Sequence, residues 1–185
     1  MIRHSIAASA LLLVILASTP TFAVTQWQAK PAANSISWTV KSSDPIKGYC
    51  KNFTSDIAFD PATLAQSSVK IIIDMTSCRT GVAERDNLLP TFEWFNESKF
   101  SKAEFNGTKF RALGGNRYVA DGMLTLKGAA KPVMLDFTLD IKGADAHVQG
   151  AATIERMNFG VGNSTPGSYV GLDVVVNIDL KATKN

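Results

Sequence analysis

The chain has 185 residues, a formal net charge of +3 and 45% hydrophobic residues. This length suits one domain with a hydrophobic core, and so weak a positive charge gives no reason to expect nucleic acid as a partner. There are two histidines, His4 and His147. Because His4 belongs to an N-terminal segment that we expect to be removed, histidine-rich metal sites and two-histidine proton relays are excluded.

Residues 1–23 have the pattern of a secretory signal peptide. Arg3 and His4 precede an uncharged run over residues 6–16, and small residues lead to Ala23. The apolar run is about half of the ~20 residues that a membrane-spanning helix needs. We therefore expect cleavage after Ala23, export to the periplasm and a single mature domain of residues 24–185.

Apolar residues at a spacing of two predict about eight β-strands, because alternate side chains of a strand face opposite sides of a sheet. In chain order these runs cover residues 36–40, 53–59, 69–75, 103–111, 118–126, 133–141, 148–154 and 172–180. Short turns such as 114–116 favour antiparallel hairpins. Because closure removes exposed edges, we expect an eight-stranded antiparallel barrel, with a sandwich as the alternative.

Cys50 and Cys78 are equidistant from Leu64, the midpoint of the loop between the second and third predicted strands. Pairing about that midpoint brings the two sulfurs to opposed positions. The other facing pairs are Phe59 with Val69, Ile57 with Ile71, and Phe53 with Met75. Because an exported protein can keep such a pair oxidised, we predict a Cys50–Cys78 disulfide as a structural staple. The cysteines have the opposite parity to the apolar set, which places the bond on the outer face or rim.

The connection between the third and fourth strands interrupts the β pattern. Residues 80–89 predict a short helix that stops at Pro90, and Thr91 can cap a further turn. The same segment concentrates aromatic residues, namely Phe92, Trp94, Phe95 and Phe100. Long connections often carry function. Two interpretations therefore stay open: the aromatics plug the barrel end as core, or they form a lid or mouth for an apolar ligand.

Groups suited to catalysis are few. His147 shares the parity of polar residues, and no Gly-x-Ser-x-Gly motif accompanies it. Charges at 84–86 are typical of a solvated helix face. Arg156 has inward parity and needs a partner there. We favour an ion pair with Asp86 or Glu84 over a contact to a ligand head group. We expect a protein that is not an enzyme and holds no metal or cofactor.

Several short motifs follow one another in a fixed order along the mature chain. They are Asn34-Ser35-Ile36-Ser37-Trp38, Ile57-Ala58-Phe59-Asp60-Pro61 with Leu64, Thr80-Gly81 with Arg85-Asp86-Asn87-Leu88, Lys99-Phe100-Ser101-Lys102-Ala103-Glu104-Phe105, Asp121-Gly122-Met123-Leu124-Thr125-Leu126-Lys127-Gly128 with Lys131-Pro132-Val133, and Arg156-Met157-Asn158-Phe159-Gly160-Val161. In this order they resemble the YceI-like family of periplasmic, lipocalin-like polyisoprenoid-binding proteins. The chain departs from the family pattern at Asn87 (usually histidine), at Ser101 (usually proline) and in having Cys50 and Cys78.

The resemblance implies a lipocalin-like barrel that holds an isoprenoid or quinone-like chain, with the short helical connection beside the opening and no catalytic residues. A membrane or a membrane protein would be its donor or acceptor, and the oligomeric state, a dimer included, stays open. The apolar side chains expected to line the interior are Phe53, Ile57, Phe92, Trp94, Phe95, Phe105, Leu124, Leu135, Phe137 and Phe159. The alternative is a fully packed barrel that binds a partner, or serves a stress response, through its surface or loops.

Overall fold

The computed structural model describes residues 24–29, 31–32 and 35–185, so the expected signal peptide lies outside the described residues. Within them the regular secondary structure is almost entirely β. The strand segments are β1 (Gln26–Ala29), β2 (Ile36–Val40), β3 (Ile46–Cys50), β4 (Phe53–Ala58), β5 (Ser68–Asp74), β6 (Cys78–Arg79), β7 (Lys102–Gly114), β8 (Arg117–Leu126), β9 (Ala129–Lys142), β10 (Asp145–Glu155) and β11 (Asp173–Lys184). The short helices are η1 (Leu64–Gln66), η2 (Met75–Ser77), α1 (Ala83–Asp86) and η3 (Arg156–Phe159).

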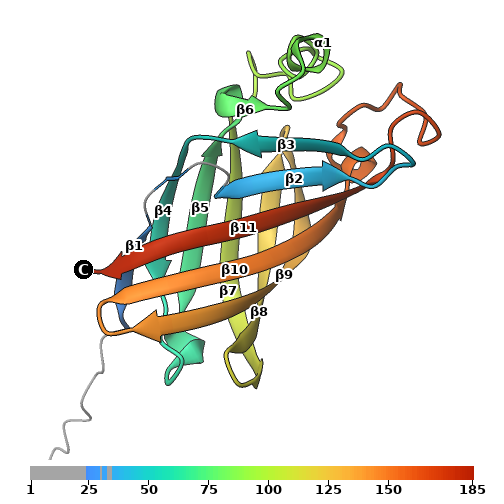
Figure 1. Cartoon of the computed structure of the whole chain (residues 1–185). Helices are drawn as coiled ribbons and strands as arrows, with labels where there is room; N and C mark the ends of the chain where they lie inside the picture. The colour runs from blue at the N-terminus through green and yellow to red at the C-terminus, as the bar shows by residue number, and fades with distance from the viewer. Residues whose placement is uncertain (1–23, 30, 33–34) are drawn as a thin grey trace, which may run out of the picture.

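These segments close into one antiparallel barrel (Figure 1). Pairing of β1 with β11, in addition to β4, closes the sheet on itself, with Trp27 opposite Lys184. Because β1 and β2 both pair with β11, they act as one interrupted strand. The segments β3 and β4 likewise form one interrupted strand, and β5 and β6 form another. Counted in this way, the described residues form the eight-stranded antiparallel barrel expected from the sequence, and the sandwich alternative is wrong. The segments β1, β3 and β6 were not expected.

The register expected for the second and third strands is wrong by two residues. Phe53 lies opposite Ile73, not Met75, and Ile57 lies opposite Val69, not Ile71. Cys50 is nevertheless opposite Cys78, in the pairing of β3 with β6. The extra two residues are taken up by η2, where the carboxylate of Asp74 accepts a hydrogen bond from the backbone N–H of Thr76 (3.0 Å).

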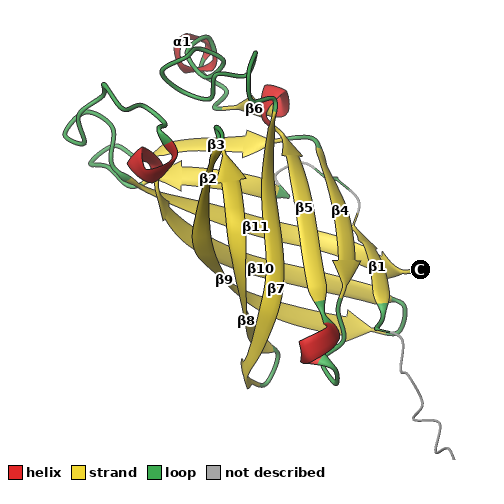
Figure 2. Ribbon diagram, turned by 180° about the vertical axis from the view of Figure 1, so that it is seen from behind, coloured by secondary structure: helices red, strands yellow, loops and turns green. Residues whose placement is uncertain are grey.

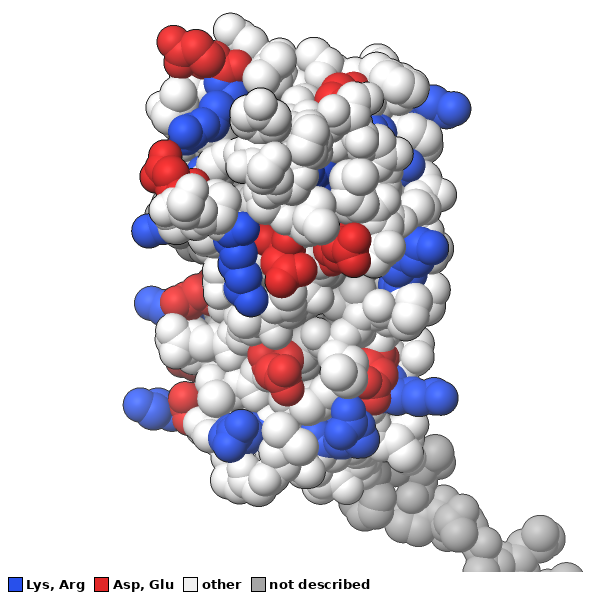
Figure 3. All heavy atoms as spheres, turned by 90° about the vertical axis from the view of Figure 1, so that its right-hand side faces the viewer, with Lys and Arg blue, Asp and Glu red and all other residues white. Residues whose placement is uncertain are grey.

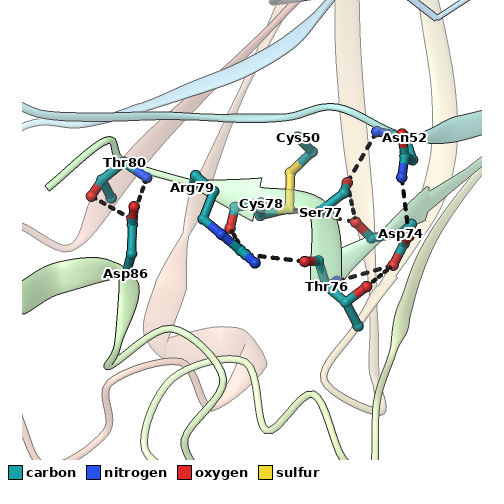
Figure 4. The surroundings of a disulfide bond; sticks show 9 residues. All are labelled: Cys50, Asn52, Asp74, Thr76, Ser77, Cys78, Arg79, Thr80 and Asp86. Atoms are coloured by element: carbon teal, nitrogen blue, oxygen red, sulfur yellow. Dashed lines mark hydrogen bonds between the residues drawn. A yellow bond between two sulfur atoms is a disulfide. The ribbon is translucent and has the colours of Figure 1, made fainter. Parts of the chain in front are cut away.

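The predicted Cys50–Cys78 disulfide is confirmed (Figure 4). Of the two expected positions, the outer face is wrong because both cysteines are buried, whereas the rim is correct because β3 and β6 pair at one end of the barrel (Figure 2). Cys78 is fully buried, with 0% of its surface exposed, and packs with Cys50, Met75 and Ala103. The interruption between β3 and β4 reverses the parity of the chain, so Cys50 and Phe53 both face inward although they are three residues apart.

One end of the barrel is closed by an aromatic cluster, which we call the floor. The ring of Phe59 meets those of Phe110, Tyr118 and Phe137 edge-on, with centroids 5.3, 5.5 and 5.8 Å away. The indole N–H of Trp27 donates to the backbone carbonyl of Phe59 (2.9 Å) and fixes it there. Edge-to-face aromatic pairs add stability beyond their buried area. In Figure 2, α1 and β6 lie at the end opposite the β7–β8 hairpin.

The disulfide should contribute strongly to stability, because it closes a 28-residue separation in the unfolded chain. Chain-entropy models give about 3 to 4 kcal/mol for such a loop. Reduction of the wild-type protein removes the cross-link without changing any side-chain volume. We expect the urea midpoint to fall on reduction, with the C50A/C78A double variant insensitive to the reductant. Equal midpoints for oxidised and reduced wild type would contradict the prediction.

Candidate functional site

The interior of the barrel contains a cavity of about 380 Å³. Protein interiors are otherwise close-packed, and ligand pockets typically occupy about 300 to 1,000 Å³, so this space has the size of a binding site. Its wall is almost entirely apolar, and Phe59, Phe110 and Phe137 of the floor form its closed end. The polar or charged residues on the wall are Thr80, Arg85 and Arg156.

Short inward side chains leave this space open. An eight-stranded barrel is just wide enough for side chains to fill its interior. Here many inward positions carry alanine, which contributes little volume. The alanines on the cavity wall are Ala103, Ala120, Ala146, Ala152 and Ala182. The interior is therefore hollow, which does not fit the alternative of a fully packed barrel.

Two loops surround the other end of the cavity, which we call the mouth. The first loop, residues 80–101, contributes Leu88, Leu89 and Trp94 to the wall, and the second loop, residues 160–172, contributes Val161 and Val170. Leu88 lines the cavity and is also 50% exposed, so the cavity approaches the surface beside it. In Figures 1 and 2 both loops lie beyond the end of the barrel that carries β6.

Asp86 holds the start of the first loop in place. One oxygen of its carboxylate accepts hydrogen bonds from the backbone N–H (2.6 Å) and the hydroxyl (2.7 Å) of Thr80, and the other accepts from the N–H of Gly81 (3.2 Å). These hydrogen bonds hold the pKa of Asp86 below its ordinary value, and the one from the backbone N–H of Thr80 has the largest effect. Because Cys78 lies two residues before Thr80, the disulfide and this carboxylate anchor the loop at its root (Figure 4).

Arg156 organises the second loop, and its expected ion pair with Asp86 or Glu84 is wrong. The side chain is only 2% exposed and donates to a set of backbone carbonyls. These belong to Val161 (2.8 Å), Gly162, Thr165 (2.6 Å), Val170 (2.9 Å) and Gly171 (3.0 Å). Burial lowers the pKa of the guanidinium, and the carbonyl dipoles replace the lost water. The structure therefore gives Arg156 a positioning role.

Polar contacts also tie the two loops to each other. The ammonium group of Lys127 donates to the backbone carbonyls of Glu93 (3.0 Å) and Gly160. The carboxylate of Glu93 accepts a hydrogen bond from the backbone N–H of Ser164 (2.7 Å). The backbone carbonyl of Glu93 accepts a hydrogen bond from the backbone N–H of Gly162 (2.8 Å). Burial lowers the pKa of Lys127. The mouth is thus held by hydrogen bonds, whereas the floor is held by aromatic packing.

Most of the side chains expected to line the interior lie on the cavity wall. These are Ile57, Trp94, Phe95, Phe105, Leu124, Leu135 and Phe137. The structure places Phe53, Phe92 and Phe159 away from it. Phe53 and Phe159 are buried within packed clusters, and Phe92 is 79% exposed, with the ammonium of Lys127 over its ring at 5.5 Å. Contact of the wall residues with a ligand remains a prediction.

The aromatic side chains of the first loop divide between the cavity wall and the surface, and their role as a mouth for a ligand remains a prediction. Trp94 and Phe95 line the cavity, whereas Phe92 faces outward. The wall alanines and Trp38 were missed, although inward parity at Ala152 and Trp38 was a signal that could have found them. His147 lies on the outer surface, partly exposed, with its ring 2.7 Å from a carboxylate oxygen of Asp179.

Neither a metal centre nor a membrane-spanning helix occurs in the part of the chain that the structure describes. No group of three or more His, Cys, Asp or Glu side chains there could hold a metal ion. Among the same residues, no helix is long and apolar enough to cross a membrane.

Fold and site together define a closed lipocalin-like barrel built around an apolar cavity. Residues 27–182 match the model of the YceI-like domain, and the chain belongs to this family. Curated relatives include UPF0312 proteins of Vibrio campbellii (30% identity over 135 residues, 70% of this chain and 71% of the relative) and Vibrio cholerae (31% over 137 residues, 71% and 72%).

Solved structures with the same fold agree with this assignment. BcnA of Burkholderia cenocepacia superposes with a TM-score of 0.76 at 31% identity, over 80% of this chain and 95% of that chain. The YCEI protein of Campylobacter jejuni gives 0.71 at 24% identity, over 79% and 88%. A polyisoprenoid-binding domain from Saccharophagus degradans gives 0.66 at 14% identity, over 86% and 98%. The last two likenesses concern the fold alone.

Removal of the Asp86 carboxylate should loosen the first loop without affecting the barrel. We expect D86A to raise amide hydrogen exchange over residues 80–89 at neutral pH, while β8 to β11 keep their protection. E84A is the matched control, because Glu84 lies on the same helix and makes no hydrogen bond or ion pair with a described residue. Equal exchange in D86A and wild type would contradict the role given to Asp86.

The same contact predicts a pH dependence with a definite sign. Because the folded pKa of Asp86 lies below its unfolded value of about 3.9, its stabilising effect is complete above that value. The effect is lost as the pH falls through the folded pKa. The difference in unfolding free energy between wild type and D86A should therefore shrink under acid conditions. A difference that grows as the pH falls would contradict this sign.

Proposed function

We propose that this protein is a non-catalytic carrier or reservoir for a long apolar isoprenoid or quinone-like lipid in the periplasm. The observation that carries the proposal is the apolar cavity, closed at the floor and approaching the surface at the mouth. A hydrocarbon chain in this space would be held by burial of apolar area, at about 25 cal/mol per Å². Selection would then depend on the shape and length of the chain.

The comparisons support a ligand of this class. The neighbour from Saccharophagus degradans is described as a polyisoprenoid-binding domain, and its fold is shared over 86% of this chain. Membership of the YceI-like family points the same way. The buried Cys50–Cys78 bond supports an oxidising compartment such as the periplasm, where disulfides persist.

The wall offers little chemistry for an enzyme acting on a lipid. Proton transfer requires a titratable group within reach of the reacting atom. His147 lies outside the barrel beside Asp179, and the guanidinium of Arg156 is occupied by backbone carbonyls. The hydroxyl of Thr80 donates to Asp86. These positions favour binding over turnover as the work of the cavity.

We further propose that the ligand enters at the mouth and that a membrane or a membrane protein donates or accepts it. Residues 157–172 contain no charged side chain, and Tyr169 within them is 80% exposed. Exposed Val82, Leu88 and Phe92 lie on the first loop. Figure 3 shows charged side chains mainly at the sides and in the lower half of its view, around a largely uncharged upper centre. Exposed apolar side chains beside an uncharged loop would shelter a lipid during transfer.

The proposed function predicts that the protein carries a lipid from its own compartment. Native mass spectrometry of protein purified from the periplasm should show a bound mass, and organic extraction should release an isoprenoid-type molecule. Incubation should leave that molecule unchanged. Protein that is uniformly free of lipid would count against a carrier, and conversion of the lipid would instead support an enzyme.

Filling the cavity should abolish lipid binding while the fold is kept. Ala152 lies on the wall in β10, and A152F places a ring in the empty space. A151F is the matched control, because Ala151 is on the same strand but not on the wall. We expect A152F to lose the co-purifying lipid and A151F to keep it, with melting temperatures close to wild type. Full lipid occupancy in a folded A152F variant would argue against the cavity as the site.

A further inference from the structure

Arg85 is the charged side chain on the cavity wall that is left without a partner. It lies on α1 and is partly buried. Within the described residues, its guanidinium makes no salt bridge and no hydrogen bond. A guanidinium carries five N–H donors in a planar fork and stays charged in proteins. Because Arg85 is partly exposed, water can serve these donors until an acceptor on a ligand replaces it.

The neighbouring acidic groups do not neutralise Arg85. The carboxylate of Asp86 is turned toward Thr80 (Figure 4). It accepts hydrogen bonds from the backbone N–H and hydroxyl of Thr80 and from the backbone N–H of Gly81. Glu84 is exposed and unpaired within the described residues, and the carboxylate of Glu93 accepts from Ser164 in the second loop. The positive charge of Arg85 is thus available at the place where the cavity approaches the surface.

Arg156 shows that position on the wall does not by itself imply a ligand. It lines the same cavity, but each of its nitrogens donates to carbonyls of the second loop. Lys127 is likewise occupied by the carbonyls of Glu93 and Gly160. Of the cationic groups at this end, Arg85 alone combines a place on the wall with donors that no described residue uses.

We propose that Arg85 binds an anionic, phosphate-bearing head group of an isoprenoid whose hydrocarbon chain occupies the cavity. This inference rests on the proposed function, because it takes the chain to lie in the barrel. A phosphate matches the planar fork through two parallel hydrogen bonds, which a neutral alcohol cannot do. The apolar wall around the remaining length of the ligand would then select the chain, and Arg85 would select the head.

The test compares two probes that share one chain, geranylgeraniol and geranylgeranyl monophosphate. Trp38 and Trp94 line the cavity, so quenching of tryptophan fluorescence reports binding. For wild type at low salt we expect the phosphate to bind about tenfold or more tightly than the alcohol. The ratio should fall as salt is raised, because part of it is electrostatic. Inorganic phosphate alone should not bind measurably.

Variants then assign the preference to one side chain. R85Q should bring the phosphate-to-alcohol ratio close to one while the affinity for the alcohol is unchanged. R85K, which keeps the charge but not the fork, should retain part of the ratio. R79Q is the matched control, because Arg79 is exposed on β6 near the same loop, donates to the carbonyls of Thr76 and Cys78, and is not on the wall. It should keep the full ratio.

The outcomes separate this inference from the function on which it rests. If wild type binds the alcohol but shows no preference for the phosphate, the role of Arg85 is refuted and the carrier function stands. The same holds if R85Q weakens both probes equally or if R79Q removes the preference. If neither probe binds wild type at any salt concentration, the proposed function itself fails. Melting curves of each variant confirm that the compared proteins are folded.

Discussion

Closure of the sheet between β1 and β11 is the constraint on which the rest of the structure depends. It makes the sheet a closed ring through β1 and fixes the number of strands, and the number of strands fixes the width of the interior. Side chains then decide whether that width is filled. Because several inward positions carry alanine, such as Ala120 and Ala152, the width becomes a cavity. The hollow interior thus follows from strand number and side-chain size together.

At the mouth, a covalent bond holds a strand segment that is too short to be held firmly by backbone hydrogen bonds. β6 is the last segment in the sheet order and pairs with β3 through two residue pairs. A strand this short is weakly held by backbone hydrogen bonds. The Cys50–Cys78 disulfide lies within that pairing, and the first loop leaves the barrel immediately after it. The bond therefore fixes the start of the first loop, which carries Arg85 and Trp94 farther along the chain.

The sequence predicted the strands well because parity is a direct consequence of β geometry. It predicted the cysteine pair from a register about Leu64 that is wrong for β4 and β5, and the pair is nevertheless correct because two extra residues precede Cys78 in β6. It could not predict the two-residue slip, since that depends on the local turn of η2 and the carboxylate of Asp74. The interruption between β3 and β4, which reverses the parity of the chain, turned the disulfide inward. Short segments such as β6 are also too brief to show any alternation.

At the candidate site, strand parity could not predict which side chains line the cavity. Parity indicates whether a side chain faces inward, but not whether empty space lies beside it. Phe53 and Phe137 have the same inward direction, yet only Phe137 meets the cavity. The hydrogen-bond partners of Arg156 could not be predicted from the sequence either. They are backbone carbonyls of a loop, which every residue possesses, so no residue type marks them. An inward-facing arginine suggests a carboxylate as its partner, and for Arg156 that expectation was wrong.

The two ends of the barrel differ in the forces that hold them, and this difference bears on ligand exchange. Opening the floor would separate the rings around Phe59 and expose buried apolar area. Opening the mouth would break hydrogen bonds, such as those of Lys127 and Glu93, whose groups water can satisfy in turn. Local opening concentrates where apolar contacts are few. A chain held in the cavity would therefore leave at the mouth, past Arg85, with its head group first.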